Sequence, residues 1–317
     1  MGYLPPFPAQ LERVEYIKLF FFLEFKDSFD LPPSGALQLR RELSRALVKM
    51  QGQADASALA RLSALLQPPL PADPLLRKQV QKPSPALVLA PDCTVAGPIE
   101  AGRTMVLPVL LLGSGIHALQ PFIELIRELG TLGFYCNRGR FKLVRLEAEQ
   151  AAGSTVPLPF DSIDQAPLAP PICDLGWWLE RQVQTGVPLR IDLSSPLRLL
   201  RQGKPLFKAS FGEIFPFILR RVTGMLASHA GVDNICSPTT LIAAAGQVKE
   251  LENSLRWFDL RSLQRDRGEQ KLGGLMGHLL LEGDALSELL WVLQIGSLLN
   301  LGKGASFGHG QYGLCVS

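Results

Sequence analysis

Glycines near the end of the sequence are dense enough to shape a ligand-binding backbone. The segment GKGASFGHGQYG follows an apolar run, and five of its glycines lie within twelve residues. Glycine is used where the backbone takes positive φ or where another group must approach closely. Amides exposed in such a loop, beside Lys303, would hold phosphate groups. A tight turn into a buried strand accounts equally for some of these glycines, which are Gly302, Gly304, Gly308, Gly310 and Gly313.

Two phosphate-binding motifs come close to this segment without matching it. Residues 296–304 read GSLLNLGKG, with five residues between the glycines where a Walker A loop has four. A glycine also stands where Ser or Thr would bind magnesium. GKGASFG has three residues between its second and third glycines, one more than the dinucleotide fingerprint, and it follows a helical pattern instead of a strand. We therefore expect neither motif to operate here.

Basic residues gather in clusters that could neutralise phosphates, while aromatic or guanidinium planes stack on unpaired bases. Solvation of a surface helix explains any single Arg, but several clusters in a protein of net charge +3 favour binding to RNA. The first cluster is Arg40, Arg41, Arg45 and Lys49; the second is Arg198, Arg201, Lys204 and Lys208, followed by Arg220 and Arg221; the third is Arg256, Arg261, Arg265 and Arg267, interleaved with Trp257 and Phe258.

Histidines could act as general acids or bases, and the sequence has four of them. His309 lies in the glycine-rich segment and is the best functional candidate, although a packing role explains it as well. His117 begins a predicted helix, His278 lies in a predicted strand, and His229 ends a helix, where an imidazole favours the helix dipole. Tyr16 and Lys18 are weaker candidates for proton transfer.

Metal and disulfide frameworks are not expected. No two histidines stand at zinc spacing, and no carboxylate cluster indicates a magnesium site. The five cysteines are odd in number and widely spaced, which favours a reduced, cytoplasmic compartment. Residues 1–10 are proline-rich and lack a basic start, so no signal peptide is expected. Charges at Glu282, Asp284 and Glu288 exclude the most apolar stretch as a membrane span.

The elements that position these residues repeat in two halves. The composition, 47% hydrophobic and 19% charged, is typical of a folded protein, and the length allows two domains. Periodicity predicts strands and helices alternating as β-α-β-β-α-β in each half, the ferredoxin-like order. The first half comprises strand Val14–Phe25, a helix N-capped by Ser34, a helix over 54–66, an apolar run over 86–90, strand 104–112, a helix over 115–129 stopped at Gly130, and an edge-like strand over 141–146.

The second half has the same order of elements. It comprises strand 189–193, helix 211–229, a strand ending near Asp259, strand 274–282, helix 287–299 and a terminal strand. We expect an α+β fold of two tandem ferredoxin-like (RRM-like) domains, over residues 1–150 and 187–317. Residues 151–186 mix Pro, Ala, Gly and Asp with little periodicity, which predicts a linker.

The motifs then point to a known family. LGGLMG at residues 272–277 and GKGASFGHGQY at residues 302–312 resemble the LGGxxG and GKxxxFGxGxY elements of CRISPR repeat RNA endoribonucleases of the RAMP superfamily. LPPSGALQLRRELSRAL resembles the lead-in and first helix of that family. The segments PSPALVLAP, TMVLPVLLLG and GRFKLVRLE follow in the family's order. The resemblance spans nearly the whole chain and is weakest over residues 150–186.

The resemblance implies a nuclease of antiviral CRISPR defence that cuts precursor RNA at its repeats. Such enzymes need no metal or cofactor: the adjacent 2′-hydroxyl attacks phosphorus and leaves a cyclic phosphate and a 5′-hydroxyl. Many members use a first-helix histidine as base, and Arg45 stands at that position here, while residues 1–116 contain no histidine. Arginine stays protonated, so Arg45, with Arg40 or Arg41, would align the phosphate and stabilise charge.

Two functions remain open on this reading. The first is an endoribonuclease that stays on the repeat hairpin of the CRISPR RNA and joins the subunits of an effector complex. The alternative is a non-catalytic RAMP subunit that binds and caps that RNA. An unrelated α+β scaffold would make the glycine-rich match a coincidence.

Overall fold

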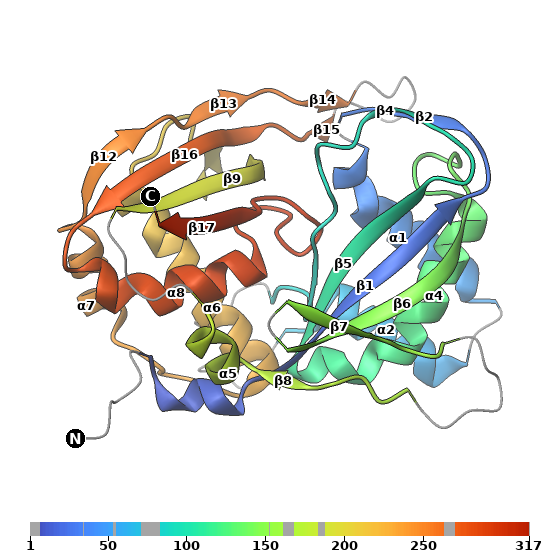
Figure 1. The fold of residues 1–317 in the computed structure, drawn as a ribbon, viewed down its shortest axis with the longest axis horizontal. Helices are drawn as coiled ribbons and strands as arrows, with labels where there is room; N and C mark the ends of the chain where they lie inside the picture. The colour runs from blue at the N-terminus through green and yellow to red at the C-terminus, as the bar shows by residue number, and fades with distance from the viewer. Residues whose placement is uncertain are drawn as a thin grey trace. The chain divides into compact units, whose positions relative to one another are not determined.

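The computed structural model describes two compact units (Figure 1). The N-terminal unit comprises residues 15–70 and 83–173, and the C-terminal unit residues 7–14 and 174–316. The residues described are 7–33, 35–52, 55–70, 83–151, 153–160, 168–182, 188–262 and 270–316. The 3-10 helix η1 (Ala9–Arg13) contacts α5 (Leu175–Glu180) and so belongs to the C-terminal unit. The bounds 1–150, 151–186 and 187–317 stay a prediction.

The N-terminal unit is built on an antiparallel sheet with its first strand in the middle (Figure 1). Its order is β3–β5–β1–β6–β7. The first four of these strands are, in chain order, β1, β3, β5 and β6, and they lie side by side as second, third, first and fourth, which is the arrangement of a ferredoxin-like fold. β8 (Cys173–Asp174) also pairs with β1. The strands are β1 (Glu15–Phe25), β3 (Leu87–Leu89), β5 (Thr104–Leu112), β6 (Phe141–Ala151) and β7 (Ser154–Pro157).

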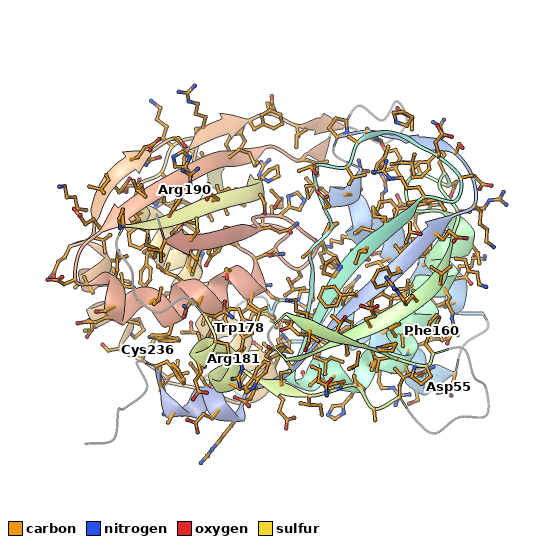
Figure 2. All side chains as sticks on the ribbon, viewed as in Figure 1. Asp55, Phe160, Trp178, Arg181, Arg190 and Cys236 are labelled. Atoms are coloured by element: carbon orange, nitrogen blue, oxygen red, sulfur yellow. The ribbon has the colours of Figure 1, made fainter. Side chains whose placement is uncertain are left out.

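Helices pack on this sheet through apolar side chains. Successive side chains of a strand point to opposite faces, and Phe21 of β1 meets Phe122 of α4 edge to face, with ring centroids 5.8 Å apart. Asp55, labelled in Figure 2, caps α2 by accepting hydrogen bonds from the N–H groups of Ser57 and Ala58. The remaining elements are β2 (Phe29–Leu31), η2 (Ala36–Gln38), α1 (Leu39–Met50), α2 (Ala56–Leu66), β4 (Gly97–Ile99), η3 (Gly113–Ala118) and α4 (Leu119–Leu132).

The C-terminal unit repeats the arrangement with its own sheet, in the order β12–β16–β9–β17. β13 extends the row of β12 along β16, and the helices lie on one face of the sheet (Figure 1). Ser210 and Glu213 form a capping box at the start of α6. The elements are β9 (Leu189–Leu197), β10 (Leu200–Arg201), β11 (Lys204–Pro205), α6 (Phe211–Ala230), α7 (Pro238–Ala245), β12 (Lys249–Asn253), β13 (Arg256–Phe258), β14 (Arg261–Ser262), β15 (Gln270–Lys271), β16 (Gly274–Glu282), α8 (Leu286–Leu299) and β17 (Tyr312–Val316).

The predicted α+β fold of two ferredoxin-like units is confirmed, and two local predictions are wrong. α4 does not stop at Gly130 but continues to Leu132, because the residue with positive φ is Gly133 (φ 106°). β6 is not an edge strand, since β7 pairs on its outer side. Within residues 151–186, the predicted linker, the structure places β7, β8 and α5.

The predicted N-cap Ser34 lies outside the described residues. Within the described ranges, no helix has both the length and the apolar character needed to cross a membrane.

Candidate nucleic-acid interface

A buried carboxylate organises the basic residues of α1. Glu42 is 1% exposed, and its two oxygens face two different arginines. Oε1 lies 2.9 Å from Nε of Arg41 and 2.5 Å from its Nη2, while Oε2 lies 2.7 Å from Nη1 of Arg45. Two residues of the first cluster, Arg41 and Arg45, are therefore held in a fixed orientation by the carboxylate between their guanidinium groups.

The turn after α4 completes this arrangement. Arg41 donates to Sγ of Cys136 (3.0 Å), and Arg45 donates to the side-chain oxygen of Asn137. The amide of Cys136 donates to Oε1 of Glu42 (3.4 Å). Cys136 and Asn137 have positive φ (48° and 63°), which turns the chain sharply enough to bring both side chains to α1. We call Arg41, Glu42, Arg45, Cys136 and Asn137 the arginine clamp.

The charge of the arginine clamp favours anions. One carboxylate balances only one of the two guanidinium groups, so a single positive charge remains. Burial lowers the pKa of Arg41, but the contact with Glu42 outweighs this and the net shift is upward. Lys49 does not add to this surplus, because its Nζ lies 2.5 Å from Glu128. Arg40 is exposed on α1.

The glycine-rich segment is a packed loop against the end of β9. Four of its five glycines have positive φ: Gly302 (83°), Gly304 (87°), Gly308 (96°) and Gly310 (63°). A Cβ on Gly302 would lie 2.6 Å from the carbonyl oxygen of Arg198. The tight turn foreseen as one explanation of these glycines therefore accounts for four of them.

Several amides of the loop donate hydrogen bonds within the protein. Lys303 donates to the carbonyl of Arg198 (2.9 Å), and Gly310 donates to that of Pro196 (3.1 Å). Phe307 and His309 both donate to the carbonyl of Gly304 (2.8 and 3.4 Å). The expectation of a broad cradle of exposed amides is thus corrected, and the exposed basic side chain of this loop is Lys303.

Arg221 holds the loop from within the fold instead of facing solvent. Its guanidinium donates to the carbonyl of Leu299 at the end of α8 (3.0 Å) and to Oγ of Ser306 in the loop (3.1 Å). Burial lowers the pKa of Arg221 to about 10, so the group stays charged at neutral pH. Its neighbour Arg220 is exposed and lies over the ring of Phe217, 5.0 Å from the centroid.

Arg221→Met is expected to lower the free energy of unfolding by about 1–3 kcal/mol, because buried acceptors lose a charged donor. Chemical denaturation measures this difference. Arg220→Met is the matched control, since it removes an exposed charge one position along the same helix. Equal stability of the two variants would show that the contacts of Arg221 do not hold the loop.

The second and third basic clusters meet around Trp257. The guanidinium carbon of Arg198 lies 5.9 Å from the Trp257 ring centroid, and the ring of Phe207 lies 4.6 Å from it. Arg201 pairs with Glu213 (3.2 Å), whereas Lys204 is exposed at the tip of the β10–β11 hairpin. Arg256 is exposed; Arg261 belongs to β14, where only its backbone is described, and Arg265 and Arg267 lie outside the described residues.

The histidines lie in different surroundings. His309 is 9% exposed, and its ring packs on Gly304, where a Cβ would lie 2.6 Å from Cδ2. This placement favours the packing role for His309. His278 contacts Oγ of Ser254 through Nδ1 (2.9 Å) and lies 2.9 Å from Glu252 through Nε2. His229 is buried and His117 exposed.

The two weaker proton-transfer candidates are already engaged in the fold. Tyr16 is buried in β1, and Lys18 pairs with Glu149 (2.7 Å). In the described parts of the chain, no three His, Cys, Asp or Glu side chains gather as metal ligands.

Sequence reasoning missed the residues that organise the interface. Glu42 directly follows Arg41 and stands three residues before Arg45, and the second of these spacings allows pairing along a helix. That spacing could have suggested a pair, but it gives no sign that the carboxylate is buried. Phe207 and Asn137 carried no signal beyond their residue types.

Comparisons with known proteins bear on the same regions. Residues 191–312 match the family of the CRISPR-associated endoribonuclease Cas6, and residues 12–166 match a family described as an N-terminal domain. The first of these matches contains the glycine-rich loop and the surroundings of Trp257. A search of curated proteins found no match.

Solved structures share the fold at low sequence identity. A partial Cas6-RT-Cas1–Cas2 complex matches 99% of this chain and 47% of its own at 16% identity, with a TM-score of 0.57. The present chain thus spans about half the length of that relative. A Cas6 from Thermus thermophilus matches over 95% of this chain and 99% of its own at 13% identity, with a TM-score of 0.52. A Cas6 product complex gives the same TM-score at 14% identity.

Proposed function

We propose, from the membership of this chain in the Cas6-type family of CRISPR repeat-processing endoribonucleases, that it cuts CRISPR precursor RNA at its repeats without a metal ion. The match over residues 191–312 carries this proposal, because it includes the glycine-rich loop beside a basic and aromatic surface. The arginine clamp of the N-terminal unit supports it, since a surplus positive charge in an ordered setting suits a phosphate.

The proposed reaction is a transesterification within the RNA. The 2′-oxygen next to the scissile phosphate attacks phosphorus, the bond from phosphorus to the 5′-oxygen breaks, and the products are a 2′,3′-cyclic phosphate and a 5′-hydroxyl. Negative charge grows on the non-bridging oxygens as the phosphorus becomes five-coordinate. Groups that stabilise this charge lower the barrier without taking up a proton.

Arg45 and Arg41 take that role in the proposal. Both guanidinium groups are oriented by Glu42, and an oriented donor loses little freedom when it binds a phosphate. Arginine remains protonated and does not serve as the base. The proton of the 2′-hydroxyl then passes to water, and the leaving 5′-oxygen takes a proton from water, which predicts slow cleavage.

Incubation with labelled repeat RNA from the source genome in the presence of EDTA tests this function. We expect cleavage at one position in each repeat, with a product end that resists phosphatase until acid opens the cyclic phosphate. Tight binding without any product would instead support the alternative, a non-catalytic RAMP subunit that holds and caps the CRISPR RNA.

Arg45→Ala is expected to slow single-turnover cleavage at least about tenfold, while Arg41 remains to hold part of the charge. The rate constant at saturating protein measures the effect independently of binding. Arg127→Ala is the matched control, because Arg127 also pairs with a glutamate three residues away, at 2.7 Å on α4. If both variants cut at the wild-type rate, the arginine clamp has no part in the chemistry.

We further propose that the protein stays on the repeat after cleavage and hands the RNA to other CRISPR subunits. The basic surfaces suit a lasting hold on an RNA hairpin, and one related Cas6 chain is part of a complex with Cas1 and Cas2. Size-exclusion chromatography after cleavage should show the protein eluting with the repeat-derived fragment. Elution of free protein after a complete reaction would contradict retention.

A further inference from the structure

An aromatic pair on the surface of the C-terminal unit is suited to hold a flat ring. Phe207 and Trp257 lie with their ring centroids 4.6 Å apart and their planes inclined by 56°. Phe207 lies in the segment between β11 and α6, and its side chain is 57% exposed. We propose that this pair is a stacking platform for an unpaired nucleobase of the bound RNA, an inference that rests on the proposed function.

The position of Trp257 connects the stacking platform to the glycine-rich loop. Trp257 of β13 pairs with Leu275 of β16, and Leu275 in turn pairs with Leu197 of β9. Arg198 follows Leu197; its guanidinium approaches the Trp257 ring at 5.9 Å, and its carbonyl accepts the amide of Lys303. One residue, Arg198, therefore touches both the platform and the glycine-rich loop.

The surrounding charge identifies nucleic acid as the occupant. Residues 198–208 read RLLRQGKPLFK, with four cations and no acidic residue, and Lys204 and Lys208 are exposed. Cations that flank an exposed aromatic face match a strand whose phosphates alternate with bases. An apolar segment of a protein would gain nothing from these lysines, because it carries no charge for them to pair with.

The strand geometry supplies a control within the same element. Phe258 follows Trp257 and is 53% exposed, but consecutive residues of a strand point to opposite faces. Its partner across the ladder is Gly274, whereas that of Trp257 is the buried Leu275. Phe258, which the sequence grouped with Trp257, therefore does not belong to the platform: it is an exposed aromatic residue of the same type as Phe207, on the other side of the sheet from Trp257.

Two probes of equal charge separate stacking from phosphate binding. One is a fluorescein-labelled oligouridine of about 12 nucleotides, and the other is an abasic ribose-phosphate chain of the same length. We expect the wild-type protein to bind oligouridine more tightly than the abasic chain. Phe207→Ala and Trp257→Ala should each weaken oligouridine binding about tenfold and leave abasic binding unchanged. Phe258→Ala should alter neither affinity.

The outcomes distinguish this inference from the proposed function. Equal affinity of the wild type for the two probes, or unchanged oligouridine affinity in Phe207→Ala, overturns the platform. If Phe207→Ala keeps the RNA affinity of the wild type but no longer binds a protein subunit that the wild type binds, the surface serves a protein partner instead. A wild-type protein that neither binds nor cuts repeat RNA overturns the proposed function itself. Phe207→Ala changes an exposed side chain, so its thermal unfolding should match that of the wild type.

Discussion

Gly310→Ala is expected to lower the free energy of unfolding by about 3 kcal/mol and to disrupt the packing of the glycine-rich loop against the end of β9. Gly310 has a φ of 63°, and an added Cβ would lie 1.9 Å from the carbonyl oxygen of Leu301. The same two residues are joined by a hydrogen bond from the amide of Leu301 to the carbonyl of Gly310. The clash therefore pushes Leu301 and Gly310 apart and weakens the hydrogen bond that closes the glycine-rich loop.

Gly313→Ala is the matched control for this prediction. Gly313 lies three residues further on, in β17, where an added Cβ meets nothing within 4 Å. Its substitution should change the stability by less than about 0.5 kcal/mol. Urea denaturation of the three proteins measures both differences, and repeat RNA binding should fall only in Gly310→Ala. Similar denaturation midpoints for the two variants would contradict the close packing of the loop.

Glu42→Ala is expected to cost about 3 kcal/mol of folding free energy and most of the cleavage activity. The substitution leaves two guanidinium groups side by side without the carboxylate that separates them. Arg41 and Arg45 can then turn toward water, which limits the loss of stability but abolishes their orientation. Loss of orientation affects the rate constant more than the affinity for RNA, because the positive charges remain.

The split between affinity and rate tests the role of Glu42 in positioning. Glu42→Gln keeps the shape of the side chain, and it should retain more stability than Glu42→Ala while cleavage stays slow. Glu124→Ala is the control, since Glu124 pairs with Arg127 near the surface of α4 and such pairs contribute at most about 1 kcal/mol. An unchanged cleavage rate in Glu42→Gln, measured at saturating protein, would falsify the positioning role.

The fold could be predicted from periodicity because both sheets bury one apolar face. Strands 104–112 and 274–282 were predicted at the bounds that the structure gives, since each reads as an apolar run between turn residues. β7 escaped prediction because its residues, STVP, are short and mostly exposed, so no buried face leaves a pattern. The mistake about β6 followed directly, because an unrecognised neighbour makes a strand look like an edge.

The candidate site was less accessible to sequence reasoning. Residue type identified the arginines, but not whether each faces solvent or the protein interior. Arg221 and Arg220 are adjacent in sequence, yet the first holds the loop from inside and the second is exposed. The contacts of Arg45 with Asn137 and of Arg198 with Trp257 join residues that are 92 and 59 positions apart. Such contacts depend on the complete fold.

The strand order of the N-terminal unit also affects how the chain is made. β1 contains the apolar run LFFFLEF, and it pairs with β5 and β6, whose first residues follow Phe25 by 79 and 116 positions. At a synthesis rate of about 10 residues per second, β1 waits roughly 10 s for its second partner. During that interval its edges and apolar side chains are open to aggregation, so the yield of native protein should depend on chaperones and translation speed.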